Sequence, residues 1–315
     1  MTEWWPVVEE GAWWMVLAAP AALLCFALVA VVANAALDAQ NAGRSFTATT
    51  LVRPLLAVPQ ALMAQPRRMP APDRLLWRAG VVTVPAAAVL SVLVIPFGNH
   101  VVADLSVGVV WFNAMEVLTW AGLWLAGWGP NAAFSLIGGY RFLAQGLAYE
   151  LPLMFALISA STGAQSLRVT DIVGAQHGLW YAVWMPFAFV VYLAGVLAFS
   201  FLGPFAYPAG LDVAGGVLGE ASGVDRLLLQ AGRWLWLAAG AAMAVPLFLG
   251  GGTGPGLSAW AWSLVKTLLV LGLLVWVLRR LPAIRADRYV ELAWVVLLPL
   301  AIVQALVPAL VNLNL

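Results

Sequence analysis

The chain has 315 residues, of which 63% are hydrophobic and only 9% are charged. A soluble domain carries roughly 25% charged residues and about 45–50% apolar ones, so this composition excludes a soluble globular protein and indicates an integral membrane protein. The formal net charge of +1 gives no sign of a nucleic-acid partner. A single cysteine, Cys25, excludes a disulfide framework and an iron–sulfur cluster held by this chain.

Apolar segments long enough to cross a bilayer follow one another along almost the whole sequence. A membrane span needs about 20 apolar residues, and this length predicts eight spans within a single membrane domain over residues 1–315. The fold class is therefore expected to be an all-α polytopic membrane protein. The expected spans are 12–34, 79–97, 106–127, 139–160, 177–200, 231–250, 257–279 and 290–311.

The distribution of basic residues predicts the orientation of these spans. Thirteen arginines lie in or beside the connections at 35–78, 128–138, 201–230 and 280–289, whereas Arg168 alone lies on the other side. Because basic connections stay in the cytoplasm, we expect both termini on the outer (periplasmic) side of a bacterial plasma membrane. The stretch LVRPLLAVPQALMAQ at 51–65 is expected to lie along the membrane surface, with its apolar residues toward the lipid.

Ionisable residues inside a span are costly to bury and mark functional sites, and three occur here: Glu116, Glu150 and Lys266. Glu116 and Glu150 lie at nearly equal distances on either side of the connection near Asn131, so an antiparallel hairpin places them at similar depth. Two carboxylates in a low-dielectric interior do not both stay ionised, and one of them is expected to hold a proton. This pair predicts a proton relay.

The same residues also have structural interpretations. Glu116 is equally well explained as a protonated hydrogen-bond donor between two helices, and Lys266 either neutralises a buried carboxylate or relays charge. On the fourth predicted span, Arg141, Gln145 and Tyr149 follow one another at one-turn spacing, which predicts a polar stripe along that helix.

The sequence around these residues resembles a family signature. The run AGWGPNAAFSLIGGYRFLAQGLAYELPL at 126–153 is similar to that of the NuoH family of bacterial NADH–quinone oxidoreductase (complex I), where AGW-x-SNSKY precedes G-x-x-R-x-x-x-Q and S-Y-E. Matching positions are Ala126–Trp128, Asn131, Gly138, Arg141, Gln145, Tyr149 and Glu150. Similar stretches follow in order at 94–111, 211–223, 246–251, 263–282 and 285–289, so the resemblance covers nearly the whole chain.

The resemblance implies a membrane subunit without catalytic residues of its own in a proton-translocating assembly. Quinone would bind at the interface with partner subunits, which would carry the flavin (FMN) and the iron–sulfur clusters, and no metal is expected in this chain. Other membrane-arm and peripheral-arm subunits and the lipid bilayer would be its partners, with no nucleic acid. The expected proton path is Glu116, Glu150, Tyr149, Arg141 and Lys266, and the expected chamber loops carry Asp212, Glu220, Arg285 and Asp287.

The chain departs from the family pattern where the family carries charge. In the first loop, the family's Asp and Lys positions read Ala57 and Gln60, and four charged family positions are uncharged over 198–210. Glu116 falls where the family commonly has a small polar residue. Either the proton route is rebuilt around Glu116 and Glu150, or coupling is weakened.

The expected function is thus to form part of the quinone chamber of a complex-I-type enzyme and to couple quinone reduction to proton translocation. One alternative is the equivalent subunit of a membrane-bound hydrogenase or formate hydrogenlyase, where no quinone need bind. Another is a non-redox ion transporter or scaffold. Association with iron–sulfur subunits separates the last alternative from the first two.

Overall fold

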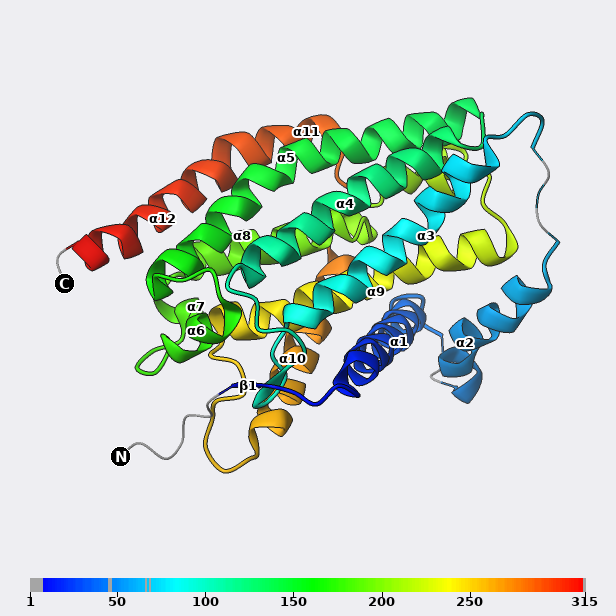
Figure 1. Cartoon of the computed structure of the whole chain (residues 1–315). Coiled ribbons are helices and arrows are strands. Elements are labelled where there is room, and N and C mark those ends of the chain that lie inside the picture. The colour runs from blue at the N-terminus through cyan, green and yellow to red at the C-terminus, as the bar shows by residue number, and fades with distance from the viewer. Residues whose placement is uncertain (1–7, 45–46, 66, 68, 314–315) are drawn as a thin grey trace.

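The computed structural model describes residues 8–44, 47–65, 67 and 69–313, which form an almost entirely helical bundle (Figure 1). Within this part of the chain, seven helical segments are long and apolar enough to cross a membrane. They are α1 (Met15–Asn41), α3 (Arg74–Ser91, continued by a 3-10 turn to Val94), α4 (Gly108–Trp128), α5 (Ala133–Ala164), α9 (Gly223–Phe248), α10 (Ala259–Arg280) and the continuous segment from α11 (Ala286–Leu292) through a π-helical stretch to α12 (Leu298–Leu313). The predicted all-helical, multi-pass membrane protein is confirmed.

The segment predicted as the fifth span, 177–200, is not one long helix. It forms α7 (Tyr181–Trp184) and α8 (Pro186–Phe199), which are separated at Met185. Pro186 has no backbone N–H to continue the hydrogen bonding of α7, so it begins a new helix. The 14 residues of α8 extend about 21 Å at 1.5 Å per residue, less than the ~30 Å hydrocarbon thickness. An eighth crossing therefore depends on α7 and α8 acting together.

Many of the connections between helices lie near two opposite ends of the bundle (Figure 1). At one, which we call the strand end, β1 (Glu9–Glu10) pairs in parallel with β2 (His100–Val101). The Asn312 side chain, near the end of α12, donates a 2.6 Å hydrogen bond to the Thr162 carbonyl of α5 at this same end. The other, which we call the hairpin end, contains the α4–α5 turn at 129–132. Both ends of the described chain therefore lie at the strand end.

Several helices extend beyond the predicted spans. The predicted connection 128–138 is reduced to 129–132 because α5 begins at Ala133, and α9 begins at Gly223 rather than near 231. The extra turns carry polar residues such as Arg226, which a helix tolerates where it leaves the hydrocarbon. The tight turn between α4 and α5 uses Asn131 with a φ of 54°, a left-handed conformation that Asn adopts more readily than most residues.

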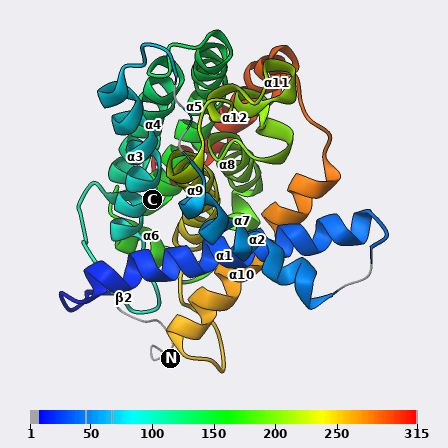
Figure 2. The same cartoon turned by 90° about the vertical axis from the view of Figure 1, so that its right-hand side faces the viewer.

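The stretch predicted to lie along the membrane surface is helix α2 (Ala48–Met63), which packs beside α1 and α9 (Figure 2). Its apolar side chains Val52, Leu56 and Leu62 are exposed. Two proline positions, Pro54 and Pro59, lie inside this helix. Residues 45–46, 66 and 68 of the predicted 35–78 connection lie outside the described residues.

Helix α9 occupies the centre of the bundle and is almost wholly buried. It packs against α1, α3, α8 and α10, while α4, α5 and α12 pack mainly on the far side of α3 and α8. Helix α3 approaches α4 closely because Gly80 has no side chain: a Cβ there would collide with the backbone of Gly122 and Ala126. Small residues at such crossings are the usual means of close packing between membrane helices.

Candidate functional site

The structure places Glu116 of α4 and Glu150 of α5 at the contact between the two helices, close enough for their carboxyl groups to interact electrostatically. Glu116 is fully buried. Its Oε1 accepts hydrogen bonds from the Tyr149 hydroxyl (2.5 Å) and from the indole N–H of Trp120 (2.9 Å). The α4–α5 hairpin positions this acid pair because the two antiparallel helices pack side by side on either side of one short turn.

Each carboxyl of the acid pair has one oxygen without a partner. Glu150 accepts a 2.8 Å hydrogen bond at Oε1 from the side-chain amide of Asn113. The Oε2 atoms of Glu116 and Glu150 and the Oδ1 of Asn113 are buried and have no hydrogen-bond partner among the described residues. Since buried polar atoms are nearly always hydrogen-bonded, these oxygens are suited to holding a proton or an internal water.

Aromatic side chains separate the acid pair from the rest of the bundle. The Tyr149 ring lies 6.4 Å from that of Phe199, centroid to centroid, and Phe199 in turn packs edge-on against Phe112 and Trp236. All four side chains are fully buried. Such an apolar surrounding lowers the local dielectric and strengthens the hydrogen bonds within the cluster.

Arg141 lies at the hairpin end rather than with the acid pair. Its Nη2 donates a 2.6 Å hydrogen bond to Asp212, and its guanidinium stacks 3.9 Å from the ring centroid of Tyr207. The hydrogen bond from Arg141 lowers the pKa of the exposed Asp212 carboxyl below its usual value. Nine residues further along α5, Glu150 is about 13 Å away at 1.5 Å per residue.

The other residues assigned to the chamber loops also lie at the hairpin end. Glu220 accepts a 2.9 Å hydrogen bond from Arg67. Arg285 and Asp287 form an exposed ion pair of 3.3 Å with each other. Glu220 lies in the connection between α8 and α9, and Arg285 lies in the connection between α10 and α11. These two connections are joined by a hydrogen bond of 2.9 Å from the backbone N–H of Ile284 to the carbonyl of Pro204.

Lys266 lies at the strand end, where backbone carbonyls surround its ammonium group. Nζ donates to the carbonyls of Leu249, Gly251 and Thr253 at 2.7, 2.9 and 2.7 Å, and it lies 4.3 Å from the ring centroid of Trp180. The ammonium thus sits just beyond the last turn of α9, where a cation is favoured. All three of its donor positions are used, so its geometry is that of a structural tie.

The sequence did not single out three further polar residues, of which Asn113 and Trp120 are half-buried and Arg233 is buried. Asn113 and Trp120 lie three residues before and four residues after Glu116, and this spacing places all three on one helix face, so they could have been found. Arg233 was counted among the arginines in or beside the 201–230 connection, but it is buried inside α9 and donates to the Phe201 carbonyl at 2.5 Å. Arg233 is buried because α9 begins at Gly223, ten residues earlier, so that Arg233 lies inside the helix and not in a connection.

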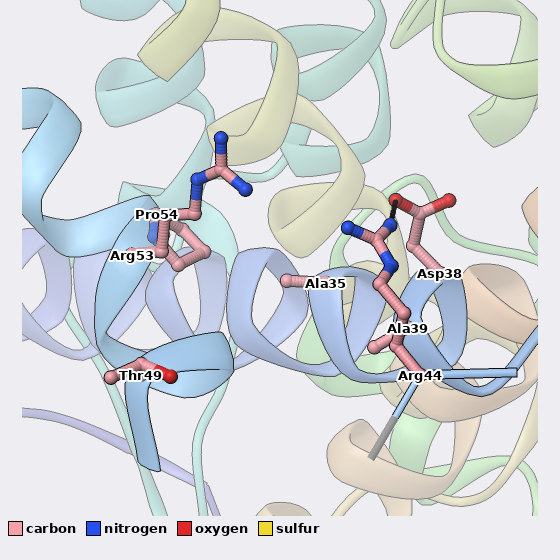
Figure 3. A pocket seen from close by; sticks show the side chains of 7 residues that line it. All are labelled: Ala35, Asp38, Ala39, Arg44, Thr49, Arg53 and Pro54. Carbon is pink, nitrogen blue, oxygen red and sulfur yellow. Dashed lines mark ion pairs between the residues drawn. The ribbon is translucent and has the colours of Figure 1, made fainter. Parts of the chain in front are cut away.

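A cavity of about 830 Å³ lies between α1, α2 and α9. Most of its wall is apolar, and its polar positions are Asn34, Gln60, Arg226 and Gln230. A smaller, more polar hollow of about 600 Å³ shares Ala35 and Pro54 with it (Figure 3). Within the described part of the chain, no group of three or more His, Cys, Asp or Glu residues could hold a metal ion.

These features define a polytopic helical membrane protein with a buried acid pair between two spans and an apolar cavity beside its first helix. The sequence model of the NADH dehydrogenase family matches residues 44–309, and the chain belongs to this family. It is 34% identical over 268 residues to the first NADH-quinone oxidoreductase H subunit of Geobacter metallireducens and to the second H subunit of Geobacter sulfurreducens, with 82% of each chain covered.

A third relative, the NADH-quinone oxidoreductase H subunit of Rubrobacter xylanophilus, is 35% identical over 251 residues, or 75% of each chain. The family resemblance found in the sequence motifs is therefore confirmed over most of the chain. The match includes α4 and α5, which carry the acid pair.

Proposed function

We propose that this chain is a membrane subunit of an NADH–quinone oxidoreductase, that it forms part of the quinone chamber, and that it couples quinone reduction to proton translocation. Its family membership and its relatives, which are named as H subunits of this enzyme, support the proposal. The partners would be the other membrane-arm subunits and a peripheral arm that carries the flavin and iron–sulfur clusters, and the location would be a bacterial plasma membrane.

The observation that carries the proton-coupling part is the acid pair with its two partnerless oxygens. Glu116 and Glu150 together would hold one proton, because a second negative charge is disfavoured in this apolar interior. Tyr149 is hydrogen-bonded to Glu116 and lies beside Glu150 in the chain, so its hydroxyl is placed to pass a proton onward. Arg141 and Lys266, which the sequence also assigned to the path, would not transfer protons themselves; they would hold in place the hairpin-end loop and the α9–α10 connection at the two ends of the bundle.

The quinone-chamber part is supported by the apolar cavity between α1, α2 and α9. An isoprenoid tail is apolar, and ligand cavities of about 300–1,000 Å³ with few polar groups suit such molecules. Asp212, Glu220, Arg285 and Asp287 lie at the same hairpin end as α2 and would border the headgroup region together with partner subunits. Quinone bound there would supply the redox chemistry, while this chain would orient it and exchange protons.

The proposed topology has eight crossings, with α7 and α8 crossing as one broken span and both termini on the outer side. A test uses single cysteines in a Cys25→Ser background, at positions that are exposed: Leu179→Cys before α7, Leu211→Cys after α8 and Leu257→Cys at the strand end. A membrane-impermeant maleimide should label positions 179 and 257 in intact cells and position 211 only after permeabilisation. Labelling of 179 and 211 from the same side would contradict the α7–α8 crossing.

The functional test compares the intact complex carrying Glu150→Gln or Glu116→Gln with wild type. Quinone reduction and quinone-dependent proton uptake are measured in reconstituted vesicles. Glu291→Gln serves as the matched control, because Glu291 is an exposed acid that pairs with Arg288 on α11. We expect both acid-pair variants to lose proton uptake and the control to keep it.

Three outcomes would overturn the proposal, or one part of it, in different ways. Copurification with hydrogenase subunits and without quinone-reductase activity would favour the alternative of a membrane-bound hydrogenase. Purification without any iron–sulfur subunit would favour a non-redox transporter or scaffold. Full proton uptake in the Glu116→Gln, Glu150→Gln double variant would leave the family assignment intact but remove the acid pair from the proton path.

A further inference from the structure

A polar hollow of about 600 Å³ lies where α1 ends and α2 begins (Figure 3). It is separate from the acid pair and from the hairpin-end loop residues described above. Its lining combines charged, hydroxyl and small apolar side chains: Ala35, Asp38, Ala39, Arg44, Thr49, Arg53 and Pro54. Arg44 reaches toward Asp38 across the end of α1, whereas Arg53 projects separately from α2 (Figure 3).

The hollow has an excess of positive charge. Asp38 is its one acidic residue, and Arg279 of α10 already binds Asp38 Oδ1 at 2.9 Å, while Arg44 lies 3.8 Å from Oδ2. Arg53 has no ion-pair partner among the described residues. One carboxylate against three guanidinium groups leaves two positive charges uncompensated, which an anion entering the hollow would balance.

The backbone holds the anion-facing groups in place. At the end of α1, the N–H of Ala42 donates to the Asp38 carbonyl at 3.0 Å and that of Arg44 to the Ala39 carbonyl at 2.9 Å. This turn uses Gly43 at a φ of +65°, a conformation that glycine adopts without strain. Thr49 lies in the first turn of the 16-residue α2, where N–H groups without helical partners and the helix dipole favour negative charge.

Apolar surface surrounds the hollow. It shares Ala35 and Pro54 with the apolar cavity between α1, α2 and α9, and α2 exposes Leu55, Leu56 and Leu62. The site therefore offers a basic polar compartment with apolar contacts directly beside it. This combination matches an amphiphile with an anionic headgroup, whereas the uncharged ring of a quinone has no need for two excess positive charges.

We propose that this hollow binds the phosphate headgroup of an anionic phospholipid from the leaflet at the hairpin end, with Arg44 and Arg53 as the phosphate-binding residues. Basic pockets beside membrane helices recognise such headgroups through charge and N–H donors. The acyl chains would lie along the exposed face of α2 and α1. A lipid bound there would stabilise the α1–α2 junction beside the proposed quinone cavity.

The test measures lipid binding to the delipidated, intact complex by native mass spectrometry. Phosphatidylglycerol and phosphatidylcholine with identical acyl chains are titrated onto wild type, Arg44→Gln/Arg53→Gln and Arg53→Lys. Arg280→Gln is the matched control, since Arg280 is another arginine at the hairpin end but stacks on Trp276. Each arginine near an anionic headgroup contributes about 1 kcal/mol, so the double variant should bind phosphatidylglycerol roughly 25-fold more weakly.

The proposal requires tight phosphatidylglycerol binding, weak phosphatidylcholine binding, retention in Arg53→Lys and no change in Arg280→Gln. Equal binding of the two lipids, or unchanged phosphatidylglycerol affinity in an assembled double variant, would overturn it. Displacement of the lipid by a short-chain quinone, with no preference for anionic headgroups, would assign the hollow to the quinone route instead. Binding is read directly, so the result does not depend on whether the complex reduces quinone.

Discussion

The acid pair and the Lys266 site are both buried and ionisable, yet they differ in how their polar atoms are satisfied. The three donor positions of Lys266 meet three backbone carbonyls at the end of α9. Glu116 and Glu150 each keep one buried oxygen without a partner. A buried charge whose bonds are all used stabilises a fold, whereas buried oxygens with unused capacity can gain and lose a proton. The comparison separates a structural tie from a reactive site.

Removing the acid pair should give the largest effect. Glu116→Gln together with Glu150→Gln is expected to lower quinone-dependent proton uptake by about 10²-fold or more, because positioned proton-transfer groups typically contribute 10²–10⁴-fold. The amide keeps the size of each side chain, so assembly should be unchanged. Uptake is measured with a pH-sensitive dye in reconstituted vesicles. A double variant that assembles and takes up protons normally would show that the acid pair, like Lys266, is structural and not reactive.

Removing the Lys266 ammonium should act on stability and leave proton transfer intact. Lys266→Met leaves three backbone carbonyls without a donor, and unpaired buried acceptors cost about 1–3 kcal/mol each, so a loss on the order of 3 kcal/mol or more is expected. The measurement is the Tm of the purified complex, with Arg280→Gln as control. If Tm were unchanged and proton uptake were lost, Lys266 would take part in proton transfer as the acid pair is proposed to do.

Removing a hydrogen-bond donor to Glu116 should give an intermediate effect. Tyr149→Phe leaves Trp120 as the remaining donor to Glu116 Oε1, and a hydrogen bond to a charged group contributes about 1.5–3 kcal/mol. We expect proton uptake to fall roughly tenfold, with a shifted pH profile. Tyr181→Phe, which removes a buried hydroxyl from α7 at the strand end, is the matched control. Equal profiles for the two variants would argue against a positioning role for Tyr149.

The smallest effect is expected at the Arg141–Asp212 pair, in which the Asp212 side chain is exposed and that of Arg141 is half-buried. Arg141 lowers the pKa of Asp212 in the folded protein, so the pair stabilises the fold above the unfolded carboxyl pKa of about 3.9 and loses this contribution as the pH falls through the folded value. Asp212→Asn should therefore lower the free energy of unfolding at pH 7 by no more than about 1 kcal/mol, which is seen as a slightly lower Tm. The difference from wild type should shrink below pH 4; a constant difference would contradict the ion-pair explanation.

The sequence anticipated the candidate site unevenly. The approach of Glu116 to Glu150 was predictable because both positions are counted from one short turn. Arg141 was assigned to the proton path through the family resemblance, but a loop more than sixty residues later supplies its partner, Asp212. Lys266 was expected either to neutralise a buried carboxylate or to relay charge, and the structure surrounds it with backbone carbonyls. Sequence spacing shows what lies along one helix and cannot show which distant segment packs against it.

A multi-pass helical membrane protein follows from the sequence, because a bilayer requires long apolar segments whose backbone hydrogen bonds are satisfied internally. The family also follows from the sequence, through motifs spread along the chain. The folded structure was needed to show that α7 and α8 are separate helices, that Arg233 is buried, and which oxygens of Glu116 and Glu150 have no partner. These features depend on hydrogen bonds and packing between segments far apart in the chain, so the local sequence cannot predict them.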